Sequence, residues 1–421
     1  MSDIAIVFPG QGSQYVGMGK KLYNRYSFVK EIFEEASDIL GIDIKRLSFD
    51  EDINELTKTE NVQFAILVAS YANFKALIDE FGIKPALLAG HSLGEISALV
   101  CAEVIRFSDA LKIVKVRGRL MQEIAFEDQG CMIAIMGMES HAISEVCAEI
   151  STKGHIVTIA NYNSVDQTII SGHKAAVNEA IEKLELKGGR VMQINVNYPF
   201  HSQLMEPALE VMEDELKKYD YNPFKYPVLS SITALPYENE YEIVYSLANQ
   251  IIKPVRWQET VEYIATLGIK TVIDIGPRAI LRNLMQINDL DIDVFAYDDK
   301  KDKELIENKM VAADLAASID RSIKCKLISK CLAIAVGTEN SNWDNDAYKK
   351  GVLIPYRKIH DMLEGFEKAN TEPLYKHMKA SLDMLKTVFE TKRTPKEEQE
   401  DRFKQVLYEV GLFELFSDFL V

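Results

Sequence analysis

The sequence predicts an α/β protein: a parallel-sheet core with an inserted smaller subdomain and a helical C-terminal extension. Three observations lead to this prediction. Buried-strand patterns alternate with segments of helical spacing over residues 1–129. The pattern changes to a βαββαβ order over residues 130–196. Strand signals fade after Tyr297, and helical spacing continues to the end of the chain.

Chain length and composition agree with this organisation. A chain of 421 residues suits two or three domains, and 47% hydrophobic with 27% charged residues is typical of a folded protein. The formal net charge of −16 repels polyanions, which argues against nucleic acid or an anionic membrane as a main partner. Charged residues interrupt the most apolar stretches, so no membrane span is expected.

The chain start and the cysteines indicate a cytoplasmic location. The first residues lack the basic and apolar regions of a signal peptide. Five cysteines without a C-x-x-C pair predict neither a disulfide framework nor a zinc site. We therefore expect a protein of the reducing cytoplasm that holds no metal.

The core is expected to combine residues 1–129 and 197–299. Residues 4–8 form a β-branched run that ends in the turn-rich stretch Pro9–Ser13, which is typical of a strand leaving the functional edge of a sheet. The other expected elements of the core are helices over residues 29–39, 62–81 and 110–121, strands over residues 85–89 and 272–275, and a helix after Ser92.

The smaller subdomain is expected to be ferredoxin-like, because βαββαβ is the order of that split motif. Its expected strands are residues 132–136, 156–160, 168–171 and 191–196, and its helices are residues 141–150 and 175–186. The extension, residues 300–421, is either a packed helical appendage or a docking surface for a partner protein. The last helix is expected to carry one apolar stripe, made of Phe403, Val406, Leu407, Val410, Phe413 and Phe416.

The segment Gly90–Gly94 reads G-H-S-L-G between a predicted strand and a predicted helix. Small flanking residues permit a tight turn that projects Ser92 above the sheet as a nucleophile. The N–H of Leu93 would then point at the oxyanion formed on an attacked carbonyl. A purely structural turn is the alternative.

A serine nucleophile needs a base, and His201 is the best candidate among seven histidines. It lies in a turn after a predicted strand, at the edge of an element. His141, His155 and His173 fall inside the smaller subdomain. From the residues alone, a surface or core histidine remains the alternative.

Seven motifs in one order closely resemble the malonyl-CoA:acyl carrier protein transacylases and the acyltransferase domains of polyketide synthases. The resemblance covers Met1 to about Tyr297. The extension is similar to those on some separate acyltransferases that serve polyketide or hybrid peptide–polyketide assembly lines. The motifs are Phe8–Gln14, Gly90–Glu95, Val116–Met121, Asn161–Ser164, Phe200–Ser202, Pro254–Trp257 and Ile275–Pro277.

The resemblance implies a hydrolase-like core and assigns catalytic roles. Ser92 would accept the acyl group, with His201 as its partner. Gln11 and Leu93 would give backbone donors to the oxyanion hole, and the main chain of Gln250 would orient the histidine.

The resemblance also assigns the substrate-binding residues. Arg117 would pair with the free carboxylate of a malonyl group, a task suited to a planar guanidinium. Met121 and Phe200 would line the acyl pocket, although both could be core residues. Asn161 belongs to a matching motif, and Arg190 matches a position that binds coenzyme A phosphates. Further candidates for anion binding are Lys187, Arg278 and Arg282.

The implied reaction moves malonyl from malonyl-CoA to Ser92 and then to the phosphopantetheine thiol of an acyl carrier protein. No further cofactor is implied, and the pathway is fatty-acid, polyketide or hybrid synthesis. One rival is an acyl hydrolase that clears carrier proteins, which would gain nothing from a buried Arg117. The other is a non-catalytic assembly subunit, which would not need Ser92 and His201.

Overall fold

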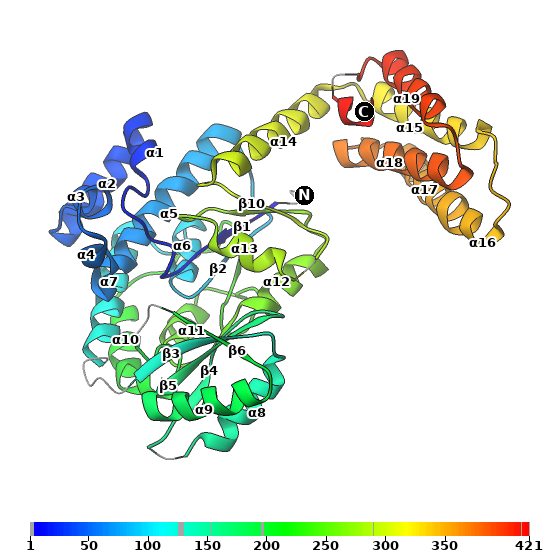
Figure 1. The fold of residues 1–421 in the computed structure, drawn as a ribbon. Helices are drawn as coiled ribbons and strands as arrows, with labels where there is room; N and C mark the ends of the chain where they lie inside the picture. The colour runs from blue at the N-terminus through cyan, green and yellow to red at the C-terminus, as the bar shows by residue number, and fades with distance from the viewer. Residues whose placement is uncertain are drawn as a thin grey trace. The chain divides into compact units, whose positions relative to one another are not determined.

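The structure, a computed structural model, describes residues 4–124, 130–152, 154–194, 198–288, 290–413 and 415–420. The boundary between its two compact units lies between Ile306 and Glu307. This boundary falls inside the long helix α14 (Lys300–Ser318), labelled in Figure 1. Within the described part of the chain, no helix is both long and apolar enough to cross a bilayer.

A five-stranded parallel sheet forms the centre of the first unit, in the order β10-β9-β1-β2-β7. Apolar side chains such as Val7, Ala89 and Val272 are fully buried and pack in one cluster with Trp257 from a covering helix, as parallel strands covered on both faces require. The strands are β1 (Ile4–Phe8), β2 (Leu87–Gly90), β7 (Val228–Leu229), β9 (Thr271–Asp274) and β10 (Asp293–Ala296).

Helices surround this sheet, and the four that the spacing predicted correspond to α2, α5, α6 and α7 within a few residues. The helix α5 is buried along most of its length, and its central run Phe64–Ala69 is entirely apolar. The helices of this layer are α1 (Lys20–Arg25), α2 (Ser27–Leu40), α3 (Ile44–Phe49), α4 (Ile53–Thr57), α5 (Thr59–Phe81), α6 (Leu93–Cys101), α7 (Phe107–Ile124), α10 (Leu209–Leu216), α11 (Glu242–Gln250), α12 (Trp257–Thr266) and α13 (Ile280–Gln286). A 3-10 helix, Gln203–Ala208, precedes α10.

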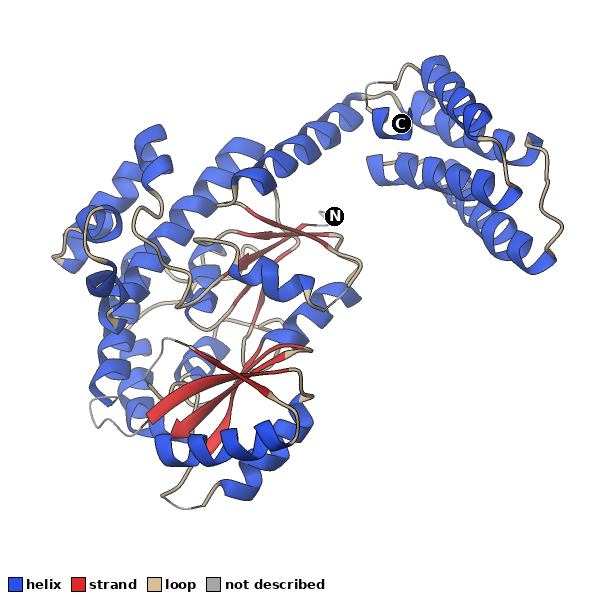
Figure 2. Ribbon diagram, viewed as in Figure 1, coloured by secondary structure: helices blue, strands red, loops and turns tan. Residues whose placement is uncertain are grey.

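A second sheet has the order β6-β3-β5-β4-β8. Its first four strands pair antiparallel, whereas β8 pairs with β4 in parallel. The helices α8 (Ser140–Ile150) and α9 (Lys174–Leu186) cover one face and share a core with its strands (Figure 2). The strands are β3 (Gly130–Met136), β4 (Val157–Ser164), β5 (Gln167–His173), β6 (Arg190–Gln193) and β8 (Val255–Arg256). The end of the expected strand 191–196 falls partly outside the described residues.

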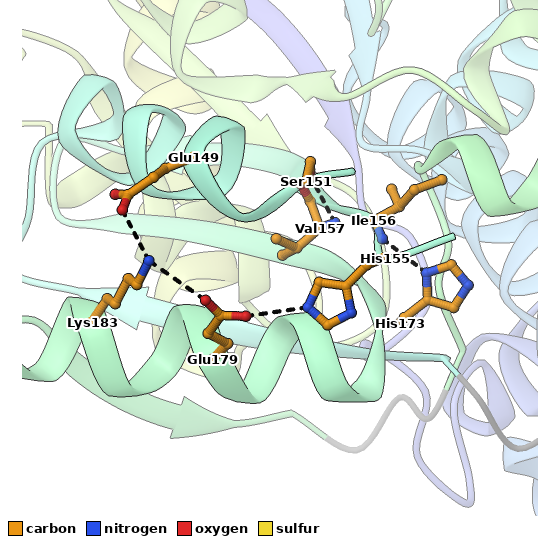
Figure 3. A network of polar contacts seen from close by, with 8 residues as sticks. All are labelled: Glu149, Ser151, His155, Ile156, Val157, His173, Glu179 and Lys183. Atoms are coloured by element: carbon orange, nitrogen blue, oxygen red, sulfur yellow. Dashed lines mark hydrogen bonds and ion pairs between the residues drawn. The ribbon is translucent and has the colours of Figure 1, made fainter. Parts of the chain in front are cut away.

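Polar contacts join the two helices of this sheet to the loop before β4 (Figure 3). Lys183 on α9 contacts Glu149 on α8 at 3.0 Å, and Glu179 contacts both Lys183 and the His155 ring. His173 Nδ1 accepts the N–H of Ile156 at 2.9 Å. Two of the histidines that the sequence placed in this subdomain therefore have structural partners.

The second unit is helical and has an apolar core of its own. Its helix α19 ends at Val410, because Gly411 adopts a φ of 72° that stops the helix. The predicted apolar stripe was therefore wrong in one respect: Phe413 and Phe416 lie beyond the helix, although Phe416 is still buried. The helices are α15 (Arg321–Gly337), α16 (Asn345–Tyr348), α17 (Ile354–Ala369), α18 (Tyr375–Lys392) and α19 (Lys396–Val410), with a π-helical turn at Lys349–Leu353 and a 3-10 helix at Ser417–Leu420.

A chain that ends at Ile306 is expected to remain folded, because the apolar clusters of both sheets draw their side chains from residues before that point. Circular dichroism during heating should show a cooperative transition for this fragment, as for the full chain. A fragment that lacks near-ultraviolet signal would show instead that the first unit depends on residues 307–421.

Candidate active site

Ser92 sits in a sharp turn between β2 and α6. Its backbone has a φ of 52° and a ψ of −110°, a conformation that is strained for a residue with a side chain. A Cβ at Gly90 would lie 2.0 Å from the carbonyl carbon of Gly94, and one at Gly94 would lie 1.9 Å from Phe8 O. Only glycine fits at both flanks, which explains the G-x-S-x-G spacing of the sequence.

Ser92 and His201 form a hydrogen-bonded pair. Ser92 Oγ lies 2.9 Å from His201 Nε2, and His201 Nδ1 lies 2.7 Å from the backbone oxygen of Gln250. Because that oxygen can only accept, Nδ1 carries the proton, and Nε2 is free to accept one from the serine. The ring is thus held in the tautomer of a general base by a backbone carbonyl.

The environment of His201 keeps its ring neutral. Burial, and then the positive charge of Arg117, lower the pKa of His201 to about 3, against the weaker opposing effect of the hydrogen bond to Gln250. A neutral imidazole at physiological pH can take a proton from Ser92 without first losing one.

Arg117, on α7, is almost completely buried beside the nucleophile. Its guanidinium donates to Ser92 Oγ at 3.0 Å, to Gln250 Oε1 at 2.9 Å and to Gln63 Oε1 at 2.6 Å. Burial lowers the pKa of Arg117 to about 10, so the group stays charged near neutral pH, and Glu95 partly offsets this effect. Since Oγ accepts from Arg117, its own proton is directed at His201.

These groups open onto a cavity of about 690 Å³. Its lining contains Ser92, His201 and Arg117 together with the other residues that the sequence placed there: Gln11, Leu93, Met121, Asn161 and Phe200. The loops after β1, β2 and β9 all contribute, which is where the carboxyl ends of parallel strands converge. Among the described residues, we find no partner for the buried Oδ1 of Asn161.

The four basic residues that were predicted to bind anions lie at different distances from the cavity. Arg278 lines the cavity. Arg190 is exposed on β6 and lies 3.9 Å from Asp166, outside the lining. Lys187 is an exposed residue just after α9, and Arg282 is paired with Asp302 at 3.3 Å. Of the four, only Arg278 faces the cavity directly.

Sequence reasoning missed a layer of buried polar residues behind the site. Gln63 and Glu95 are fully buried, and Ser231 and Tyr237 contact the Glu95 carboxylate. The one signal for Gln63 was its polarity inside the apolar segment of α5. The side chain of Gln250 was also missed as a partner of Arg117, because only its backbone had been considered.

The geometry suits transfer of an acyl group through a serine ester. A nucleophile, an oriented neutral base and a cation that could hold an anionic substrate group meet at one cavity wall. Within the described parts of the chain, no set of three or more His, Cys, Asp or Glu side chains could hold a metal ion.

A family model described as "acyl transferase domain" matches residues 5–292. The chain belongs to this acyltransferase family. A malonyl CoA-acyl carrier protein transacylase of Bacillus subtilis is 36% identical over 95% of this chain and 99% of its own length, so the similarity extends into the second unit. One of Escherichia coli (strain K12) is 40% identical over 68% of this chain and 92% of its own. The resemblance predicted from the sequence is thereby confirmed.

Solved acyltransferase structures match about three quarters of the chain. A malonyl CoA-acyl carrier protein transacylase of Clostridium perfringens superposes with a TM-score of 0.72 at 35% identity, over 76% of this chain and all of its own. A malonyl-transacylase in complex with its type II polyketide synthase acyl-carrier protein gives a TM-score of 0.69 at 37% identity, over 72% of this chain and 97% of its own. The α/β fold of the acyltransferase family is therefore shared.

Proposed function

We propose that the protein transfers malonyl from malonyl-CoA to the phosphopantetheine thiol of an acyl carrier protein. The observation that carries this proposal is the buried, charged Arg117 guanidinium 3.0 Å from Ser92 Oγ. A buried cation is costly unless an anion uses it, and malonyl differs from acetyl by one carboxylate. The names of the relatives, and the carrier-protein complex of one solved neighbour, support the same substrates.

The first half-reaction forms the acyl enzyme. His201 Nε2 takes the Ser92 proton as Oγ attacks the thioester carbonyl, and the N–H groups of Gln11 and Leu93 stabilise the tetrahedral oxyanion. The C–S bond then breaks, and His201 returns its proton to the leaving thiolate of coenzyme A. In the second half, His201 takes the proton of the phosphopantetheine thiol, whose sulfur attacks the ester carbonyl. The C–O bond to Ser92 then breaks, and His201 returns the proton to Ser92 Oγ.

The remaining residues shape the substrate site. Met121 and Phe200 give an apolar wall to the acyl group, and the unpartnered Oδ1 of Asn161 offers an acceptor inside the cavity. We assign Arg190 and Arg278 to the phosphates of coenzyme A; Arg190 is exposed and lies 3.9 Å from Asp166. No cofactor is needed beyond the thioester and the carrier's own phosphopantetheine.

We also propose a division of the chain into three parts. We assign a hydrolase-like core to residues 1–129 and 197–299, a ferredoxin-like subdomain to residues 130–196 and a helical extension to residues 300–421. The strand order β6-β3-β5-β4 with two helices on one face supports the ferredoxin-like assignment. We also propose a cytoplasmic location, which the five free cysteines support.

Arg117→Ala is expected to lower malonyl loading roughly 10- to 150-fold relative to acetyl loading, which corresponds to one lost charge-assisted pair of about 1.5–3 kcal/mol. Acetyl-CoA has no carboxylate to lose this contact. Loading rates of both thioesters, measured by intact-protein mass spectrometry, test the proposal. Equal losses for the two acyl groups would mean that Arg117 supports the fold and would favour the hydrolase alternative.

A further inference from the structure

Glu95 is a fully buried carboxylate one helical turn beyond the nucleophile. Its oxygens receive the Ser231 N–H at 3.2 Å and the Tyr237 hydroxyl at 2.6 Å, together with the Ser231 hydroxyl and the Gln250 amide. Two of these four groups, the Ser231 N–H and the Gln250 NH₂, can only donate, so each of them needs an acceptor oxygen on Glu95. Burial raises the pKa of Glu95, and the hydrogen bonds from Ser231, Tyr237 and Gln250 oppose that rise.

The Gln250 side chain lies between Glu95 and the reactive groups. Its Nε2 donates to Glu95 and to the backbone oxygen of Ser92 at 3.1 Å. Its Oε1 accepts from Arg117 at 2.9 Å, and its backbone oxygen accepts from His201 at 2.7 Å. One residue thus touches the nucleophile, the base and the buried cation.

The carboxylate determines which way this amide faces. An amide has a donor end and an acceptor end, and a carboxylate can face only the donor end. With Nε2 held by Glu95, Oε1 must point at Arg117. The Glu95 carboxylate also opposes the lowering of the Arg117 pKa by burial. Glu95 and Arg117 are therefore joined by hydrogen bonds to the two ends of one amide.

We propose that Glu95 is a positioning residue that acts through the Gln250 amide to fix the Arg117 guanidinium for a carboxylate-bearing acyl group. The inference deepens the proposed function and rests on it. Glu95 touches neither substrate nor reacting atoms in this scheme, and its main effect is on acyl selectivity.

Glu95→Gln tests whether Glu95 sets the orientation of the Gln250 amide, and it hardly changes the side-chain volume. The new amide can satisfy the Ser231 N–H and the Tyr237 hydroxyl only by turning its own NH₂ toward Gln250 Nε2. The Gln250 amide then flips, and a donor replaces the acceptor at Arg117. The hydrogen bond to Ser92 O is lost as well, which lowers loading of every acyl group by a smaller factor.

The expected result is a malonyl-to-acetyl loading ratio at least about tenfold below that of the wild type, equal to one hydrogen bond of about 1.4 kcal/mol. The matched control, Tyr237→Phe, removes a donor to Glu95 that does not touch Gln250, so the ratio should stay unchanged. In the Arg117→Ala background, Glu95→Gln should leave the ratio unaltered, because Glu95 affects the ratio by positioning the Arg117 guanidinium, which is then absent.

The outcomes separate the two proposals. A wild type that fails to load malonyl would overturn the proposed function. A wild type that loads malonyl, with equal losses for both acyl groups in Glu95→Gln, would leave Glu95 a structural residue and overturn the inference. If Glu95→Gln does not fold, Gln250→Met serves instead. It removes the amide that joins Glu95 to Arg117 and keeps the backbone oxygen that holds His201, and an unchanged ratio there would also overturn the inference.

Discussion

Replacement of Ser92 by alanine is expected to abolish acyl-enzyme formation, with a loss of at least ~10³-fold. Ser92 Oγ is the hydroxyl that lies within hydrogen-bond distance of both His201 Nε2 and the Arg117 guanidinium. Without it, the site still holds a base and an anion-binding group but has no atom to carry the ester. Intact-protein mass spectrometry after incubation with malonyl-CoA measures the result directly.

Ser97→Ala provides a matched control on the same helix. The Ser97 hydroxyl is buried without a hydrogen-bond partner among the described residues, so its removal breaks no contact. This variant should gain the malonyl mass as the wild type does. A malonyl adduct that persists in Ser92→Ala would place the acyl group on another residue and refute the assignment of the nucleophile.

Replacement of His201 by alanine is expected to slow malonyl loading by about 10²- to 10⁴-fold while leaving the final adduct on Ser92. The variant keeps the nucleophile and the oxyanion donors but loses the proton acceptor 2.9 Å from Oγ. Rapid-quench mass spectrometry gives the loading rate. A loss below about tenfold would show that water or another group serves as the base.

The pH profile of the wild type supplies a second readout of His201. Because the pKa of His201 is lowered to about 3, the ring stays neutral as pH falls from about 8 to about 5, and kcat/KM should hold nearly constant. An ordinary histidine would protonate near pH 6.5 and lose activity below it. A decline centred near 6.5 would therefore contradict the buried, neutral base.

The elements and residues that could be predicted from the sequence are those marked by a pattern within a short stretch of chain. The turn around Ser92 was predicted because glycine spacing and the flanking periodicity lie within a dozen residues. Strands β7 and β8 have two residues each and were missed, since so short a strand has no period to detect. Strand β10 was missed although it has four residues.

The layer of buried polar residues behind the site could not be predicted from any spacing pattern in the sequence. Glu95 and Gln250 are 155 positions apart, and the spacing of either residue says nothing about the other. The family resemblance pointed to the backbone of Gln250, whereas its side chain contacts Glu95 on α6 and Arg117 on α7, both far away in the sequence. Arg190, in contrast, was predicted from the family resemblance. In the structure its side chain lies near Asp166 and outside the cavity lining.

Strand β8 has a consequence for the construction of chimaeric enzymes. Val255 pairs with Asn161 and Arg256 with Tyr162, so the sheet of the smaller subdomain is completed by residues far downstream of residue 196. An exchange of residues 130–196 with a relative would leave a foreign β4 against the native β8, next to the cavity residue Asn161. A graft that respects the hydrogen-bond register must carry Pro254–Trp257 along with the inserted segment.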